Sequence, residues 1–223
     1  MKGKRYSKVL TVLLIIIIIA VIALLAYLGY SYYKKMKTQQ DAEDFVGSFT
    51  DTDDSSSSDA GTSDENALVD ESDTSSSSAT KTTYKGFEVL GTIEIPETDV
   101  KYPILATLSA KALDTAVVAA YPSPAELNTV GNVVIMGHNY RNGTFFSDNK
   151  KLSVGDNIYI TDLNGDKVKY VIYDVFQASD TDTSFYNRDT DGKMEITLST
   201  CTDDSSARII ILAAAEETED AEW

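Results

Sequence analysis

An uncharged run of 22 residues, from Val9 to Tyr30, constrains the structure of this 223-residue chain more than any other feature. An α-helix rises about 1.5 Å per residue, so roughly 20 apolar residues cross a bilayer. A cleaved signal peptide is the alternative, but its apolar core is about 7–15 residues and precedes a small-residue cleavage site. This run is longer, and its last five residues, Ala-Tyr-Leu-Gly-Tyr, lack such a site. Residues 1–37 are therefore predicted to be a cytoplasmic tail and an uncleaved transmembrane anchor.

Basic residues flank the apolar run on both sides, so the positive-inside signal is modest. Four precede it and three follow it: Lys2, Lys4, Arg5, Lys8, Lys34, Lys35 and Lys37. Because the short N-terminal tail is the easier side to retain, we expect a single-pass protein of the cell membrane with a cytoplasmic N-terminus and an extracellular domain. Aromatic rings favour the membrane interface, where we expect Tyr27, Tyr30, Tyr32 and Tyr33.

Residues 38–82 read as a linker. They contain twelve Asp or Glu residues, one Lys and two runs of four serines. Such a segment cannot bury enough apolar surface to offset its ordering entropy, so we expect a disordered, self-repelling tether. The whole chain has a formal net charge of -16, which disfavours binding to nucleic acid.

The folded domain, residues 83–223, has the sequence pattern of an all-β protein. Short runs rich in Val, Ile and Tyr alternate with turn residues, which predicts strands at Phe87–Ile95, Lys101–Ala106, Asn132–Gly137, Asn157–Asp162, Lys167–Gln177, Glu195–Thr200 and Arg208–Leu212. Helices are predicted at Ser109–Ala120, where Ser109 can cap, and at Phe145–Leu152. Many strands and few helices indicate a small closed barrel.

No cofactor or metal site is predicted. The segment Asp162–Asp166 has the Asn-Gly pair of a hairpin turn, and it lacks the acidic spacing and closing Glu of an EF-hand. The sequence does not indicate whether calcium affects the protein.

Three residues could carry chemistry, and each stands at the end or start of a predicted strand. Cys201 and His138 are the only Cys and the only His in the chain, and each follows an apolar strand, whereas Arg208 opens one. If the last two strands are antiparallel neighbours, the short loop between them returns Arg208 beside Cys201. One rim of the barrel could then hold all three side chains.

These residue types suit nucleophilic catalysis. A free thiol has a pKa of roughly 8.5, so a nearby His or Arg is needed to raise its thiolate fraction or take its proton. An imidazole can later protonate a leaving amine, and a guanidinium can stabilise an oxyanion. Each residue also has an ordinary interpretation: a small buried Cys, a His in a turn, an Arg at a solvated strand edge. Spacing alone does not decide between the two.

Two segments resemble the sortase family. The residues Thr197-Leu198-Ser199-Thr200-Cys201, followed by Arg208, resemble its TLxTC signature with the downstream Arg, and Asn132–Asn139 resembles its histidine strand. The similarity also includes Gly91–Pro96 and Tyr102-Pro103-Ile104. Residues 137–148 look like class B sortases, but the short polar segment 178–194 lacks the long helical insert of that class.

The resemblance implies a closed eight-stranded β-barrel and a Gram-positive cysteine transpeptidase. Such an enzyme cleaves an LPxTG-like sorting signal of a surface protein and transfers the acyl group to an amine of a peptidoglycan precursor or a pilin. By resemblance Cys201 is the nucleophile, His138 the acid/base and Arg208 the carbonyl or oxyanion residue, while Thr200 and Asn139 contact substrate. An exported cysteine hydrolase with the same residues, or a non-catalytic surface scaffold, are the alternatives.

Overall fold

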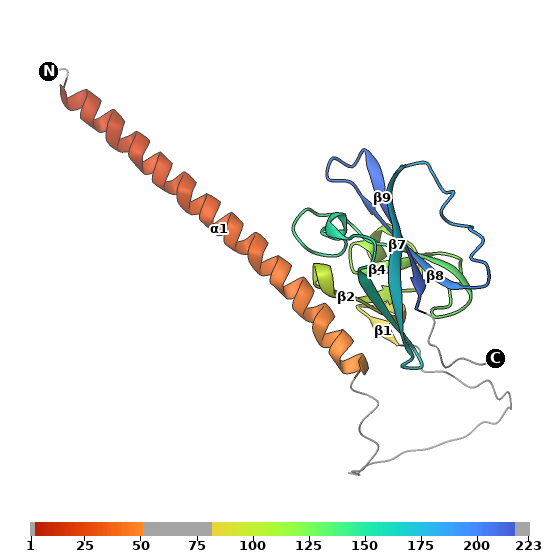
Figure 1. Ribbon diagram of the computed structural model, residues 1–223. Coiled ribbons are helices and arrows are strands. Elements are labelled where there is room, and N and C mark those ends of the chain that lie inside the picture. The colour runs from red at the N-terminus through yellow and green to blue at the C-terminus, as the bar shows by residue number, and fades with distance from the viewer. Residues whose placement is uncertain (1–2, 51–81, 217–223) are drawn as a thin grey trace, which may run out of the picture. The chain divides into compact units, whose positions relative to one another are not determined.

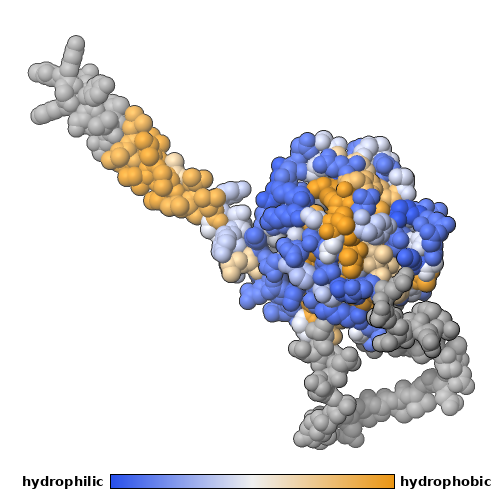
Figure 2. All heavy atoms as spheres, viewed as in Figure 1, coloured by the Kyte–Doolittle hydropathy of each residue, from blue (hydrophilic) through white to orange (hydrophobic). Residues whose placement is uncertain are grey.

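A computed structural model describes residues 3–50 and 82–216 of the chain. Its contacts divide it into two compact units, one up to Asp41 and the other from Ala42 onward. Helix α1, Gly3–Thr50, contains the apolar run (Figure 1). Its stretch Val12–Phe49 is the one described helix long and apolar enough to cross a membrane, a property that anchors and signal sequences share. In Figure 2, hydrophobic residues cover the middle part of this helix, and hydrophilic ones follow toward its C-terminal end.

The helix extends further than the sequence indicated. The predicted linker began at residue 38, whereas α1 continues to Thr50. The physical reason is an apolar spacing of three and four residues, since Ala42, Phe45 and Val46 share one helix face. These residues belong to the same compact unit as the strands, where Phe45 packs edge-on against Tyr84 at 5.0 Å between ring centroids. Residues 51–81, the remainder of the predicted linker apart from residue 82, lie outside the described residues.

The strands form one sheet that closes on itself. They are β1 (Thr83–Tyr84), β2 (Phe87–Ile95), β3 (Val100–Leu105), β4 (Val117–Tyr121), β5 (Gly131–Met136), β6 (Asn157–Asp162), β7 (Lys167–Ser179), β8 (Met194–Cys201) and β9 (Ala207–Ala215). Their order is β1-β2-β3-β4-β5-β8-β9-β7-β6, and pairing of β2 with β6 closes β2 to β9 into a barrel. The predicted eight-stranded closed barrel is therefore confirmed.

The barrel is mixed, because β3 pairs with β4 and β5 with β8 in parallel, while the remaining neighbours are antiparallel. The parallel pair β5–β8 matters for function, since parallel strands end at the same edge of a sheet. The carboxyl ends of β5 and β8 therefore meet, and these are the ends that precede His138 and Cys201.

Barrel closure requires a glycine where β2 meets β6. Gly91 pairs with Asp162, and a side chain on Gly91 would collide with the backbone carbonyl oxygen of Thr161. The register of β2 against β3 also shifts between Val89 and Gly91, as in a β-bulge. The bulge bends the strand, and glycine permits the close approach of the strands.

One predicted helix was wrong over most of its length. In the segment predicted as Ser109–Ala120, helix α2 covers only Ala110–Leu113, and β4 begins at Val117. The predicted cap is confirmed, because the Ser109 hydroxyl accepts the backbone N–H of Ala112 at 3.1 Å. The helix ends because the β-branched Val117 and Val118 pair with neighbouring strands. In the other predicted helix, Phe145–Leu152, only the short 3-10 turn η3 (Asn149–Lys151) forms; a similar turn, η2 (Pro96–Thr98), precedes β3.

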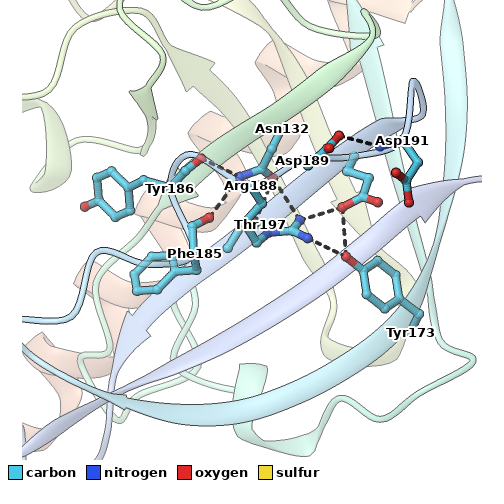
Figure 3. A network of polar contacts seen from close by, with 9 residues as sticks. Asn132, Tyr173, Phe185, Tyr186, Arg188, Asp189, Asp191 and Thr197 are labelled. Atoms are coloured by element: carbon cyan, nitrogen blue, oxygen red, sulfur yellow. Dashed lines mark hydrogen bonds and ion pairs between the residues drawn. The ribbon is translucent and has the colours of Figure 1, made fainter.

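A partly buried polar network holds the long β7–β8 connection against the outer face of β5 and β8 (Figure 3). The Asn132 side-chain amide donates to the carbonyl oxygens of Phe185 and Tyr186, each at 3.0 Å. Arg188 Nη2 lies 2.5 Å from Glu195 Oε2, and its Nη1 donates to the Tyr173 hydroxyl at 2.8 Å. Burial, followed by the hydrogen bond to Glu195, raises the pKa of Tyr173 to about 12, so this hydroxyl remains a donor at neutral pH.

We predict that Arg188→Met destabilises the barrel. Glu195 is 8% exposed, and loss of Arg188 would leave its buried carboxylate without a cationic partner. Removing one member of a buried ion pair costs about 3–5 kcal/mol of unfolding free energy. The double variant Arg188→Met/Glu195→Gln removes both charges and should be more stable than Arg188→Met alone. Urea unfolding of the full chain in detergent, followed by circular dichroism, measures the stability of both variants. Equal unfolding midpoints for wild type and Arg188→Met would contradict the prediction.

Candidate active site

Strand alternation places the three predicted residues on one face of the sheet. Side chains alternate between faces along a strand. In β8, Ile196 and Leu198 join the barrel core, so Cys201 projects to the outer face. In β5, Val133 and Ile135 face the core, and in β9, Ile209 and Ile211 do so. By the same alternation His138 and Arg208 lie on the outer face with Cys201.

Cys201 and Arg208 are direct cross-strand partners. The antiparallel register of β8 and β9 pairs Cys201 with Arg208, as the sequence predicted for a short return loop. Arg208 Nη1 donates to Cys201 Sγ at 3.9 Å. Both residues are half-buried, so the thiol is accessible and next to a permanent positive charge. A nearby guanidinium favours the thiolate form of a cysteine.

His138 reaches the same place from β5. The last paired residues of β5 and β8 are Met136 and Ser199, and Gly137 N–H donates to the Ser199 carbonyl at 3.2 Å. Extending this parallel register by two residues brings His138 level with Cys201. A side chain at Gly137 would lie 2.7 Å from the Phe146 ring, so glycine is needed to keep His138 in this position.

The structure adds two residues around His138 that the sequence analysis missed. His138 Nε2 lies 3.1 Å from Asp114 Oδ1, and the Tyr140 hydroxyl donates to the same oxygen at 2.8 Å. The Tyr140 ring also packs against the imidazole, with 4.8 Å between centroids. Asp114 is 24 residues upstream in a segment predicted to be helical, so no local pattern linked it to His138. Tyr140, two residues after His138, could have been found as a neighbour in sequence.

The structure places Thr200 and Asn139, the two residues predicted to contact substrate, in different surroundings. Thr200 shares the inward alternation of Leu198 and is 1% exposed, so its side chain lies on the opposite face from Cys201. Asn139 donates its side-chain amide to the Cys201 carbonyl at 2.9 Å and to Asp203 Oδ1 at 3.0 Å. Asn139 therefore ties the loop after β5 to the loop after β8.

An ion pair adds to this connection between the loop after β5 and the loop after β8. Lys150 Nζ lies 2.6 Å from Asp203 Oδ2, and the bonds from Lys150 and then Asn139 hold the pKa of Asp203 below its ordinary value. Because Lys150 comes from η3, three connections converge on the backbone next to Cys201. Exposed ion pairs contribute little stability alone, so the role of this one is to fix loop geometry.

The β7–β8 connection, residues 180–193, covers part of the outer face of the sheet and comes close to Arg208. Phe185 is 2% exposed and packs with Val134, Ile210 and Leu212 on the outer face. Tyr186 packs against Met136. Burial raises the pKa of the Tyr186 hydroxyl, and the positive charge of Arg208 partly opposes this shift. The polar network in Figure 3 binds the later part of this connection, at Arg188, to Glu195 of β8. Hydrophobic residues also form an irregular strip on the face of the barrel that Figure 2 shows.

The arrangement combines an accessible thiol, a fixed cation and an imidazole on one open face. These groups can attack a carbonyl, stabilise the resulting oxyanion and move a proton to or from an amine. Within residues 3–50 and 82–216, no group of three or more His, Cys, Asp or Glu side chains is placed to hold a metal ion.

The family model and the curated relative that match this chain are both sortases. A family model described as a sortase domain matches residues 93–216. Sortase A of Bacillus anthracis is 32% identical over 127 residues, which cover 56% of this chain and 58% of that relative. The match thus spans under two thirds of the relative's length.

Solved structures agree with this match. A sortase D5 transpeptidase of Clostridium perfringens is 30% identical, with a TM-score of 0.53 over 58% of this chain and 80% of that chain. Sortase A of Corynebacterium diphtheriae is 27% identical, with a TM-score of 0.53 over 61% of this chain and 64% of that chain. Because the sortase domain covers more than half of the sequence and the barrel has the same fold, this chain belongs to the sortase family.

Proposed function

We propose that this protein is a membrane-anchored cysteine transpeptidase that acts on an LPxTG-like sorting signal. The observation that carries the proposal is the contact of 3.9 Å between Arg208 Nη1 and Cys201 Sγ, on the face that also bears His138. A buried structural cysteine would need no such partner. The half-buried position of Cys201 argues against the alternative of a non-catalytic scaffold.

The reaction follows from the three side chains. The Cys201 thiolate attacks the carbonyl carbon of the Thr in the sorting signal, and the carbonyl oxygen becomes an oxyanion beside Arg208. His138 gives a proton to the leaving amine as the C–N bond breaks, which leaves a thioester on Cys201. An acceptor amine then attacks the thioester and loses a proton to His138, and the sulfur leaves as a thiolate. No proton or electron is gained or lost over the cycle.

The substrates are proposed from family membership. The donors are surface proteins with a C-terminal sorting signal, and the acceptor is an amine of a peptidoglycan precursor or a pilin. Release of the acyl group to water would make the protein a hydrolase with the same residues. Analysis of the products formed with and without an added amine separates these two functions.

The location is proposed from helix α1. Its apolar stretch suits a single membrane crossing, and the short basic tail before it suits retention in the cytoplasm. The domain from residue 83 onward would then work outside the cell. The acidic, serine-rich segment before it would act as a tether.

We predict that Cys201→Ala abolishes acyl-enzyme formation, because the chain has no other thiol. His138→Ala should slow turnover by about 10²–10⁴-fold, since general acid/base catalysis is lost and no other imidazole exists. Mass spectrometry of the full chain in detergent, incubated with a library of LPxTG-containing peptides, detects the thioester. Cleavage of the peptides by Cys201→Ala at the wild-type rate would refute the cysteine transpeptidase function.

We predict that Arg208→Lys is nearly as damaging as Arg208→Ala. Lysine keeps the charge but loses the planar fork that can hold a carbonyl oxygen, so acylation should slow by about 10²–10³-fold. Single-turnover acylation with the best library peptide measures the effect. If Arg208 only promotes thiolate formation, Arg208→Lys restores most of the rate, and the pH dependence of thiol alkylation by iodoacetamide reveals that role directly.

We predict that protease added to intact protoplasts releases the domain that contains Cys201. Cleavage should fall in the acidic tether, because exposed segments of small and polar residues are preferred sites of proteolysis. Immunoblots against the C-terminal domain, before and after treatment, measure the release. A domain that is cleaved only after lysis has the opposite orientation.

A further inference from the structure

Asp114 accepts two hydrogen bonds at one oxygen, and both come from residues of the His138 segment. Its Oδ1 lies 3.1 Å from His138 Nε2 and 2.8 Å from the Tyr140 hydroxyl. The Asp114 side chain is 63% exposed and that of His138 is 35% exposed. An exposed ion pair of this kind contributes little to folding stability. Stability therefore does not explain why this contact is made.

The backbone of Asp114 is held firmly. It follows helix α2 directly, and its N–H donates to the Ala110 carbonyl at 3.0 Å. Helix α2 is capped by Ser109 and packs through Ala112, which is fully buried with Val118 and Leu105. A helix C-terminus favours a cation over an acid. An aspartate is therefore not the residue that helix capping would select here.

Tyr140 fixes the carboxylate from the other side. Its backbone N–H donates to the Ser147 hydroxyl at 3.0 Å, and its ring packs against Phe145 as well as against His138. Burial, followed by the hydrogen bond to Asp114, raises the pKa of Tyr140 to about 12. The hydroxyl is therefore protonated at neutral pH and donates to Asp114 throughout.

We propose that Asp114 is a positioning residue for His138, with Tyr140 as its support. Asp114 holds the tautomer that carries a proton on Nε2, so Nδ1 is the nitrogen that exchanges a proton with the leaving and the incoming amine. Asp114 itself keeps its charge in every step. The same contact stabilises the positive charge that His138 carries when Nδ1 is protonated. This inference rests on the acid/base role proposed for His138.

The test compares three variants of the full chain in detergent, with the best LPxTG-containing library peptide and an excess of triglycine as acceptor. Asp114→Asn keeps the shape but loses the charge, and we expect kcat to fall about tenfold or more while KM changes little. Asp114→Glu keeps the carboxylate and should have a kcat closer to wild type than to Asp114→Asn. Tyr140→Phe removes one of the two donors to Asp114, and its kcat should lie between those of the wild type and Asp114→Asn.

Glu126→Gln serves as the matched control. It removes one negative charge from an exposed position in the β4–β5 connection, before the opposite end of β5 from His138. We expect it to keep the wild-type kcat. An equal loss in Glu126→Gln and Asp114→Asn would mean that overall charge, rather than the contact with His138, sets the rate, and this result would overturn the proposal.

A spectroscopic measurement tests the same contact without activity. The chain contains one histidine, so ¹⁵N-histidine labelling gives ring signals from His138 alone. The neutral ring of the wild type should show a protonated Nε2 and an unprotonated Nδ1. In Asp114→Asn, both signals should move toward the average of two exchanging tautomers.

The two proposals fail in different ways. If His138→Ala keeps wild-type turnover, the acid/base role itself is wrong. If His138→Ala loses turnover while Asp114→Asn keeps both the wild-type kcat and the wild-type ring signals, only the role of Asp114 is overturned.

Discussion

The parallel pairing of β5 with β8, next to the antiparallel pairing of β8 with β9, is the constraint on which the site depends. It brings together three strand ends that are distant in sequence, and alternation of side chains turns His138, Cys201 and Arg208 to one face. A shift of any of these strands by one residue would send its functional side chain into the barrel core. The apolar inner residues of the same strands prevent such a shift, so the core that stabilises the barrel also fixes the chemistry.

Three groups of residues follow one another along the outer face of these strands. At one end, Asn132 and Glu195 bind the β7–β8 connection through hydrogen bonds and the ion pair with Arg188. In the middle, Phe185 and Tyr186 cover the sheet with apolar surface. At the other end, the sheet carries the thiol, the imidazole and the guanidinium. Stability and function thus share one surface, with the partly buried polar network at the opposite end from the reactive thiol.

Much of the barrel could be predicted because its strands have strong local signals. The bounds of Phe87–Ile95 and Asn157–Asp162 agree with the structure, and the return of Arg208 to Cys201 follows from a short antiparallel loop. The segment after Ser109 misled the prediction, because a capping serine and spaced apolar residues favour a helix. There, pairing of Val117 and Val118 with β3 and β5 outweighed local helix propensity.

The sequence by itself determined the apolar helix, the β-rich domain and the identities of the lone cysteine and lone histidine, because these depend on composition and local pattern. Only the tertiary structure decided what surrounds them. The Thr200 side chain lies inside the barrel because side chains alternate along β8. Asn139 binds Asp203 because the loops after β5 and β8 lie close together. Asp114 reached His138 across 24 residues through the folding of α2 and β4, and no local pattern encodes a contact made by packing at that separation.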